Sequence, residues 1–369
     1  MKTICWLTPD SFVDVDKPII PGLLNYYNIH WIIVLNIGKG RYRESDFEEM
    51  RLLYANLEIE FIYIHKIRDV RTIADCIRIR NRILNVKSDL IYIDHPPSVP
   101  HMLPIYFSLP KDKTIVTAHD GSVKSIMKPA WLFRWSMKKG YGRLKHVQMY
   151  SISQAHEFDK NYPGHNVTII PLALKDYGEP TCEKRDDCIS FVSFGTMHPE
   201  KNVGLLIDAA DDLFDEGLRG FKVSINGVWR ESYNINDRIK HPEIYEINLG
   251  SVPNNDIPNL FGRNHYAVYP YKMMSQSGAL KVAYNYHNPV ICSNLPGFTD
   301  EVVNGIDGYI FETENKESLK SVMRECVLKG NKGYHLLRMK MARHIVENYA
   351  TETIVQNYKI MIDSVLSNI

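Results

Sequence analysis

The chain alternates short, continuous apolar runs with amphipathic stretches. In its first half, the apolar runs occupy residues 2–7, 30–37, 58–64, 89–93, 113–118, 146–152 and 167–171. Runs of this kind are typical of strands that are buried on both faces of a parallel sheet. The stretches between them, such as 72–86, repeat apolar residues at helical spacing. The first half therefore predicts a parallel α/β domain.

The same alternation starts again after a polar segment, residues 175–188, that is rich in charge and contains Gly and Pro. The later apolar runs occupy residues 188–194, 221–226, 243–249, 265–271, 289–293 and 308–312. We therefore predict an α/β protein with two Rossmann-like domains, 1–174 and 189–350, that face each other across a cleft. Residues 175–188 are the predicted linker, and 351–369 a C-terminal helix that crosses back to the first domain.

Composition and charge exclude several classes of protein. A length of 369 residues suits two domains, and 44% hydrophobic and 24% charged residues are ordinary for a globular protein. The formal net charge of +1 argues against a nucleic-acid-binding chain. No run resembles a signal peptide or a membrane span, so we expect a cytoplasmic protein. The six cysteines form no C-x-x-C pair, which favours reduced thiols over a zinc site.

Candidate chemistry is sought at strand-to-helix turns, because ligands of open α/β sheets bind beyond the carboxyl ends of the strands. The turn after the run 188–194 contains Gly195 and Thr196, followed by Lys201 at the start of an amphipathic helix. The helix dipole disfavours a cation there unless a ligand anion lies between the lysine and the free N–H groups. A surface lysine that tolerates this small cost is the alternative.

A second turn, Ser275-Gln276-Ser277-Gly278, follows the run 265–271 and leads into another helix. Serine provides a helix N-cap, glycine lets a ligand approach the backbone, and consecutive N–H groups suit a phosphate. An ordinary Ser-Gly turn is the alternative for this motif alone. Two such turns in one domain, apposed to Lys201 and Lys281, favour a diphosphate ligand.

These motifs resemble those of the retaining glycosyltransferases of family 4, which have the GT-B fold. That family shows G-R-L-x-x-E-K before an L-L-x-A-A helix, where this chain has Gly195-Thr196-Met197 and Glu200-Lys201. The resemblance covers residues 190–312 and includes P-V-I, E-V-V and G-x-x-G-Y segments. It implies a nucleotide-diphosphate sugar (UDP- or GDP-linked) as donor, no cofactor and no metal, with Lys201 acting in catalysis on the leaving diphosphate. The implied donor-binding residues are Gly195, Thr196, Asn226, Ser251, Val252, Gln276, Ser277, Gly278, Ala279 and Lys281.

In the first half, the resemblance is looser and centres on "TIVTAHDG". It implies that His119, at the end of a predicted strand, contacts the donor sugar near the scissile bond as a catalytic residue. Asp120, Pro21 and Gly22 are the other residues expected to line the site of this domain. Asp14 and Asp16 form a D-x-D sequence, a pattern that occurs by chance too often to indicate a metal site.

The chain also departs from the family pattern. Thr196 stands where the family has an arginine, and the family's two glutamates would fall near Met274 and Val282. We expect a retaining hexosyltransferase that acts on a lipid-linked or glycan acceptor, in bacterial surface polysaccharide synthesis. A catalytically inactive GT-B protein that binds a glycan or nucleotide is one alternative, and a nucleotide-sugar epimerase is another.

A basic and aromatic segment completes the sequence picture. No acidic residue occurs between Gly121 and His156, whereas an ordinary solvated helix mixes both signs. Basic residues interleaved with aromatic ones favour a peripheral contact with an anionic membrane surface over nucleic acid. A plain basic surface is the alternative. The residues expected to face the membrane are Lys128, Trp131, Arg134, Trp135, Lys138 and Lys139.

Overall fold

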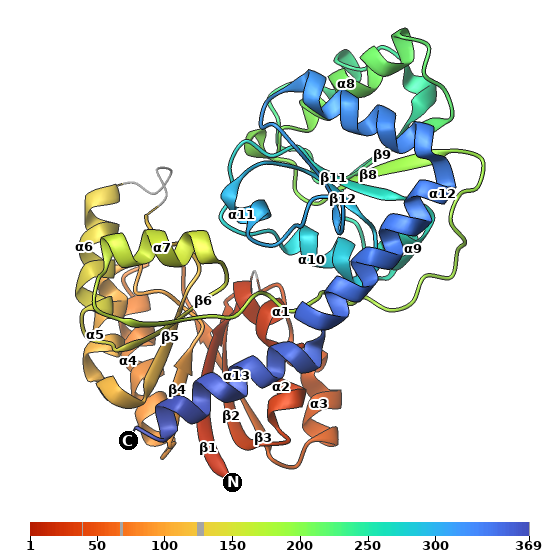
Figure 1. The fold of residues 1–369 in the computed structure, drawn as a ribbon. Coiled ribbons are helices and arrows are strands. Elements are labelled where there is room, and N and C mark those ends of the chain that lie inside the picture. Colours follow the sequence, from red (N-terminus) through yellow and green to blue (C-terminus); the bar gives the residue numbers. More distant parts are fainter. Residues whose placement is uncertain (39, 67–68, 124–128, 369) are drawn as a thin grey trace. The chain divides into compact units, whose positions relative to one another are not determined.

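The computed structural model describes residues 1–38, 40–66, 69–123 and 129–368. The chain forms two units, of which unit 1 comprises Met1–Ala173 with Thr351–Ile369 and unit 2 comprises Leu174–Ala350. Each unit is built on one parallel sheet (Figure 1). Lys128, one of the residues expected to face a membrane, lies outside the described residues.

Within the described residues, sheet A of unit 1 has seven strands in the order β3-β2-β1-β4-β5-β6-β7. The strands are β1 (Lys2–Pro9), β2 (Tyr27–Asn36), β3 (Leu57–Ile64), β4 (Leu90–Ile93), β5 (Thr114–Ala118), β6 (His146–Met149) and β7 (Asn166–Ile169). The central strands β4, β5 and β6 are buried at every residue, as their continuous apolar sequences predict. The edge strand β7 is more exposed.

Helices cover both faces of sheet A. They are α1 (Val13–Asp16), α2 (Ile20–Leu23), α3 (Glu48–Leu53), α4 (Thr72–Asn85), α5 (Leu103–Ser108), α6 (Ala130–Tyr141), α7 (Ile152–Asn161) and α13 (Thr351–Leu366). One core contains residues of α2, α3 and α13, and the other contains residues of α4 to α7. Because α13 contributes Ile354, Tyr358 and Ile362 to the first core, the end of the chain is an integral part of unit 1 (Figure 1).

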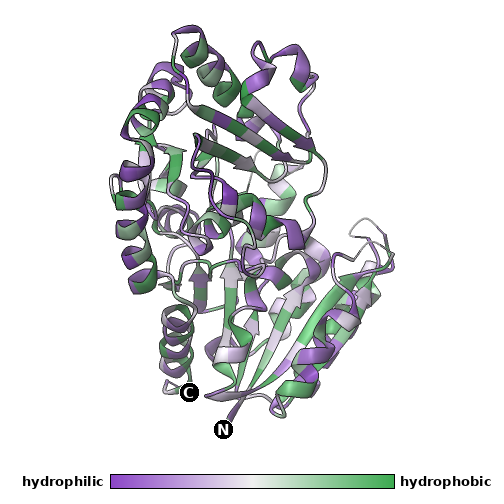
Figure 2. Ribbon diagram, turned by 90° about the vertical axis from the view of Figure 1, so that its right-hand side faces the viewer, coloured by the Kyte–Doolittle hydropathy of each residue, from purple (hydrophilic) through white to green (hydrophobic). Residues whose placement is uncertain are grey.

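Sheet B of unit 2, again within the described residues, has six strands in the order β10-β9-β8-β11-β12-β13. The strands are β8 (Ile189–Phe194), β9 (Phe221–Gly227), β10 (Tyr245–Leu249), β11 (Tyr266–Tyr269), β12 (Val290–Ser293) and β13 (Gly308–Phe311). The helices are α8 (Val203–Asp215), α9 (Ile257–Arg263), α10 (Gly278–Asn285), α11 (Pro296–Thr299) and α12 (Lys316–Asn348). Hydrophobic residues run along the strands of both sheets (Figure 2).

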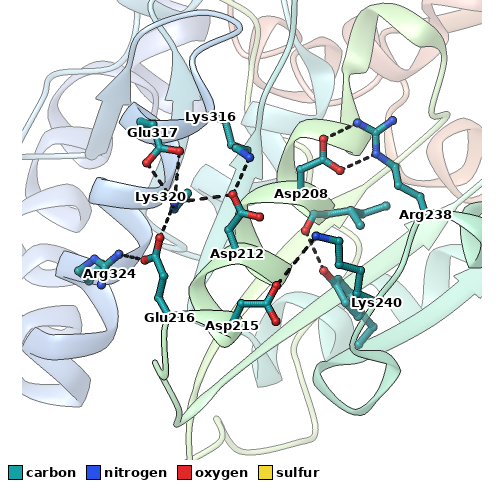
Figure 3. Close-up of polar contacts among 12 residues, drawn as sticks. Asp208, Asp212, Asp215, Glu216, Arg238, Lys240, Lys316, Glu317, Lys320 and Arg324 are labelled. Carbon is teal, nitrogen blue, oxygen red and sulfur yellow. Dashed lines mark hydrogen bonds and ion pairs between the residues drawn. The ribbon is translucent and has the colours of Figure 1, made fainter.

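A network of ion pairs fastens α8 to the start of α12 and to the segment after β9 (Figure 3). Lys316 lies 2.5 Å from Asp212, and Lys320 lies 2.6 Å from Glu216. Arg238 pairs with Asp208 and lies over Gly204, where a Cβ atom would be 2.7 Å from the guanidinium carbon. The partly exposed Lys316 and Arg238 pairs each contribute less than about 1 kcal/mol, whereas the Lys320 side chain is only 7% exposed.

The segment predicted as a linker is anchored to unit 2. The Lys184 ammonium donates to the carbonyl groups of Phe261, Gly262 and Asn264, at 3.2, 3.1 and 2.6 Å. These carbonyls lie at the C-terminus of α9, where a cation is favoured by the helix dipole. All six cysteines are unpaired.

Candidate functional site

The turn after β8 is shaped by the close approach of two glycines. Gly195 and Gly227 have φ values of +114° and +146°, and a Cβ atom at Gly227 would lie 1.8 Å from the carbonyl oxygen of Gly195. The Gly195 N–H donates to the Asn226 carbonyl at 3.0 Å, and the Met197 N–H to the Val228 carbonyl at 2.8 Å. The backbone hydrogen bonds between β8 and β9 therefore continue into this turn, past the end of the two strands. Thr196 is exposed on the turn.

Lys201 lies just before α8 rather than in its first turn. It ends a short 3-10 helix, Pro199–Lys201, and Asn202 follows with left-handed backbone angles before α8 starts at Val203. The Lys201 ammonium lies 3.7 Å from the centre of the Tyr271 ring, which follows β11. The Lys272 N–H also donates to the Glu200 carbonyl at 2.8 Å. The structure thus brings the Lys201 turn and the segment after β11 together.

The second turn forms the N-terminus of α10. Ser277 is buried and caps the helix, since its hydroxyl accepts from the Leu280 N–H at 3.2 Å. Gln276, Gly278 and Ala279 are partly exposed around it. Gly278 permits a close approach, because a Cβ atom there would lie 3.0 Å from the Lys175 ammonium.

Lys281 is a correction to the sequence analysis. Its side chain is fully buried and forms an ion pair with Glu301, and its ammonium also lies 3.9 Å from the centre of the Tyr349 ring. Burial lowers the pKa of Lys281. The Lys281 ammonium is therefore paired with Glu301 inside unit 2 and does not contact a ligand bound at the surface. The cation beside the first residue of α10 is Lys175, which the sequence analysis missed because it lies in the polar segment about a hundred residues earlier.

A pocket of about 340 Å³ lies between the ends of β9 and β10 and helix α9. Two of the predicted donor-binding residues, Asn226 and Val252, line it. Ser251 is exposed after β10. The residues that line the pocket and were not predicted are Asn248, Asp256, Asn259, Leu260 and Arg263. Polar side chains around a small pocket suit a ring with several hydrogen-bonding groups.

In unit 1, His119 and Asp94 meet at the carboxyl edge of sheet A. They follow the adjacent strands β5 and β4, and His119 Nε2 lies 2.7 Å from Asp94 Oδ1. Asp94 is fully buried and His119 is 8% exposed. The next turn is held against α7, because the Gly121 N–H donates to the Gln154 side chain at 2.8 Å. Asp120 lies between His119 and this turn.

Gly22 lies where α2 meets α13. A Cβ atom at Gly22 would lie 2.6 Å from Cγ2 of Val355, so the glycine allows α2 to pack closely on α13. Pro21 lies beside it in α2 and is half-buried. Asp16 is fully buried and accepts from the Trp6 indole N–H at 2.9 Å, whereas Asp14 pairs with Arg41 at 3.3 Å. The described residues contain no cluster of three or more His, Cys, Asp or Glu that could hold a metal ion.

Helix α6 presents the predicted aromatic and basic residues to solvent. Trp131 and Trp135 are 67% and 46% exposed, and Arg134, Lys138 and Lys139 are exposed as well. A depression of about 650 Å³ is lined by Phe107, Trp135, Lys138, Lys139, Gly142 and Arg143. No helix among the described residues has both the length and the apolar character needed to span a membrane.

The structure has the GT-B fold, with one parallel-sheet Rossmann-like domain in each unit. Residues 182–356 match the protein family Glycosyl transferases group 1. This match covers most of unit 2 and the first residues of α13. A search of the curated proteins found no match.

Solved structures with this fold match along nearly the whole chain at low identity. A glycosyltransferase from Rickettsia africae has a TM-score of 0.75 at 16% identity, with 100% of this chain and 99% of that chain covered. Sucrose-phosphate synthase from Thermosynechococcus elongatus has a TM-score of 0.76 at 9% identity, with both chains fully covered. Anabaena HepE in complex with UDP-glucose has a TM-score of 0.67 at 13% identity, with both chains fully covered.

Proposed function

We propose that the protein is a retaining glycosyltransferase that moves a sugar from a nucleotide-diphosphate donor to a glycan or lipid-linked acceptor in bacterial surface polysaccharide synthesis. One observation carries the proposal: the contact of the Lys201 turn with the segment after β11, inside the part of the chain that matches the glycosyltransferase family. The HepE structure with UDP-glucose supports a nucleotide sugar as donor class.

In this proposal, unit 2 binds the donor. The pocket lined by Asn226 and Val252 holds the base, and the N-terminus of α10 with Ser277 and Gly278 faces the diphosphate. Lys201 and Lys175 supply the positive charge. Charge placed at a leaving diphosphate lowers the barrier to cleavage of the bond to the sugar, because negative charge develops there in the transition state. Unit 1 binds the acceptor, and His119 contacts the transferred sugar.

Three measurements test the proposal. A thermal-shift series with UDP, GDP, ADP and CDP should give one preferred nucleotide, since a ligand that binds the folded state raises its stability. Donor turnover with that nucleotide's sugars should persist in EDTA, because lysines and helix N–H groups occupy the place of a metal. The anomeric configuration of the product, read by proton NMR, should equal that of the donor. A product of inverted configuration would contradict the retaining mechanism. Loss of turnover on chelation, with rescue by Mn²⁺, would contradict metal-independent transfer.

A nucleotide-binding protein without catalysis is a second candidate, and one observation favours it. Thr196 is exposed on the Gly195 turn at the position where the resembled family has an arginine. Nucleotide binding without any turnover across donors and acceptors would support this candidate.

The peripheral membrane contact is part of the proposal and rests on the α6 face, which we define as Phe107, Trp131, Trp135, Lys138, Lys139 and Arg143. Within the described part of the chain, Lys138, Lys139 and Arg143 form no ion pair. By contrast, Arg71, Arg78 and Arg82 of the α4 region pair with Asp69, Asp75 and Glu60. Unpaired cations beside exposed tryptophans suit an anionic lipid surface, and such a contact would bring the protein to lipid-borne acceptors.

A further inference from the structure

The Lys201 ammonium lies over the face of an aromatic ring. Its nitrogen is 3.7 Å from the centre of the Tyr271 ring. The two residues follow β8 and β11, which are neighbours in sheet B, so both lie at the carboxyl edge where ligands of open α/β sheets bind. A cation at this distance is attracted by the negative charge density of the ring face. Tyr271 therefore restrains the end of a long side chain that has many rotamers when it is free.

The Tyr271 ring is itself fixed in place. Tyr271 is only 3% exposed. The centre of its ring lies 5.3 Å from that of Phe298 and 5.7 Å from that of Tyr269. The hydroxyl of the buried Ser293 donates to the Tyr271 carbonyl at 2.8 Å, which holds the backbone as well. Because these contacts come from β11, β12 and α11, the ring is a rigid support for the lysine.

This support leaves the positive charge of Lys201 unneutralised. Lys272 is paired with Glu314 at 3.4 Å, and its charge is thereby partly cancelled. Lys281 is paired with Glu301 inside unit 2. In the part of the chain that the structure describes, Lys201 has no carboxylate partner of this kind. An ammonium has three hydrogen-bond donors, and a neutral ring on one side leaves donors on the other for an anion.

We propose that Tyr271 is a positioning residue: its ring holds the Lys201 ammonium in place before the donor binds, so that the lysine is already ordered when it meets the diphosphate. Ordering a free lysine on binding costs affinity, and a side chain that is ordered beforehand avoids that cost. This assignment rests on the proposed function for the identity of the ligand. Tyr271 acts through Lys201 and does not itself contact the donor.

The first test observes the ring contact without any ligand. The full-length protein is labelled with ¹³C-lysine, and the ε-methylene signal of Lys201 is assigned by its loss in K201R. Protons above a ring face are shifted upfield, so this signal should lie upfield of those of exposed lysines. It should stay there in Y271F, which keeps the ring, and move to the position of exposed lysines in Y271L. A wild-type signal already at the position of exposed lysines would overturn the proposal.

The second test changes the electron density of the ring and hardly changes its shape. Position 271 receives phenylalanine or its analogues with one, two or three ring fluorines, because each fluorine withdraws charge from the ring face. Calorimetry measures the affinity for the preferred nucleoside diphosphate. We expect Y271F to bind nearly as the wild type does, and the affinity to fall stepwise until the ring with three fluorines binds about fivefold more weakly, within the range of a cation–π contact.

The same analogues at position 266 are the matched control. Tyr266 is a residue of β11 that is 1% exposed, and its ring neighbour is Tyr334. No cation lies over the Tyr266 ring among the described residues. The fluorine series at this position should therefore leave nucleotide affinity unchanged.

K201M separates a positioning role from a structural one. If Tyr271 acts through Lys201, the fluorine series should have no effect in K201M, because the two residues form one unit. An equal stepwise loss in K201M would show a merely structural role. Affinity that rises with fluorine would show that the ring holds the lysine away from the ligand. Either result, or no change across the series in the wild-type background, would overturn the proposal. If the wild type binds no nucleotide, the proposed function fails, and the NMR spectra still decide whether Tyr271 holds Lys201.

Discussion

Lys281 of α10 and Glu301, which follows α11, form an ion pair in the interior of unit 2. Neither side chain exceeds 5% exposure, and Tyr284 and Tyr349 donate to the Glu301 carbonyl beside them at 3.1 and 3.2 Å. The pair therefore connects the helix that follows the Ser-Gln-Ser-Gly turn to the segment after α11, and Tyr349 at the end of α12 bonds the same segment.

Replacing one member of this pair should be strongly destabilising. K281M leaves a buried carboxylate without its cation, which costs about 3–5 kcal/mol, whereas K281M/E301L replaces both charges and recovers part of that loss. Urea unfolding, with hydrogen exchange in peptides of unit 2, measures the difference. K272M removes a lysine whose ion pair with Glu314 is exposed and is the control. A double variant no more stable than K281M would contradict the expected recovery.

Lys201 should matter for turnover rather than for folding. K201A removes a positive charge from the proposed diphosphate site, and we expect kcat/KM to fall about a hundredfold, the range seen when one stabilising donor is lost. Steady-state kinetics with the preferred donor measure the loss. K272A is the matched control, because Lys272 lies beside Tyr271 but pairs with Glu314 at 3.4 Å. Equal kinetics for K201A and the wild type would leave Lys201 an ordinary surface residue.

Lys175 should contribute to nucleotide affinity. Its ammonium lies beside Gly278 at the first position of α10, where a bound phosphate would offset the unfavourable interaction of a cation with the helix dipole. We expect K175M to weaken binding of the preferred nucleoside diphosphate about tenfold by calorimetry, and that of the uncharged nucleoside hardly at all. Equal weakening for both ligands would argue against a phosphate contact.

Stability should fall in mild acid because of His265. Burial lowers the pKa of His265 to about 4, from 6.5, and its Nδ1 accepts from the Ser190 N–H at 3.1 Å. Between these values the unfolded chain binds a proton that the folded protein does not. The stabilisation is therefore present above about pH 6.5 and is lost as the pH falls towards 4, by up to about 3 kcal/mol.

H265N provides the comparison for that pH effect, since its amide oxygen can accept from Ser190 but does not titrate. The free energy of unfolding of the wild type relative to H265N should decrease from pH 7 to pH 4 in urea titrations. Parallel curves for the two proteins would contradict the assignment. Burial also lowers the pKa of His95 to about 4. Because His95 is present in both proteins, its contribution to the pH dependence cancels in the comparison.

The α6 face should bind anionic vesicles. We expect cosedimentation with phosphatidylglycerol vesicles, little with neutral ones, and less at high salt, because each basic residue near an anionic surface contributes about 1 kcal/mol within a Debye length. K138S/K139S/R143S should reduce binding and keep nucleotide affinity. The matched control is K87S/K332S/K340S, which removes the same total charge from exposed positions outside the α6 face. An equal loss of vesicle binding in both triple variants, or no vesicle binding by the wild type, would contradict the proposal that the α6 face binds the membrane.

The hydrophobic pattern was sufficient to predict the fold, because strands buried on both faces need continuous apolar sequences. Every predicted run, from 2–7 to 308–312, overlaps an observed strand. Asp94 could also have been found, since it directly follows a predicted strand as His119 does. The order of strands in the sheet, which makes these two neighbours, is not a property of local sequence.

Other site features depend on contacts between distant residues. Nothing local marks Lys281 as a buried residue paired with Glu301, or Lys175 as the cation beside Gly278. Nothing local indicates that Val355, from the other end of the chain, packs on Gly22 so closely that a Cβ atom would not fit there. The short 3-10 helix before α8 reflects the left-handed Asn202, which the apolar spacing of the helix does not reveal.

The place of α13 has a consequence for synthesis on the ribosome. Ile354, Tyr358 and Ile362 fill one core of unit 1, yet they are translated after the whole of unit 2. When residues 1–173 have left the exit tunnel, that face of sheet A still lacks its covering helix, and exposed apolar surface of this kind promotes aggregation. Unit 2, whose core residues all lie within 174–350, can finish folding first. In the nascent chain, unit 2 can therefore complete its fold before unit 1, although most of unit 1 is translated first.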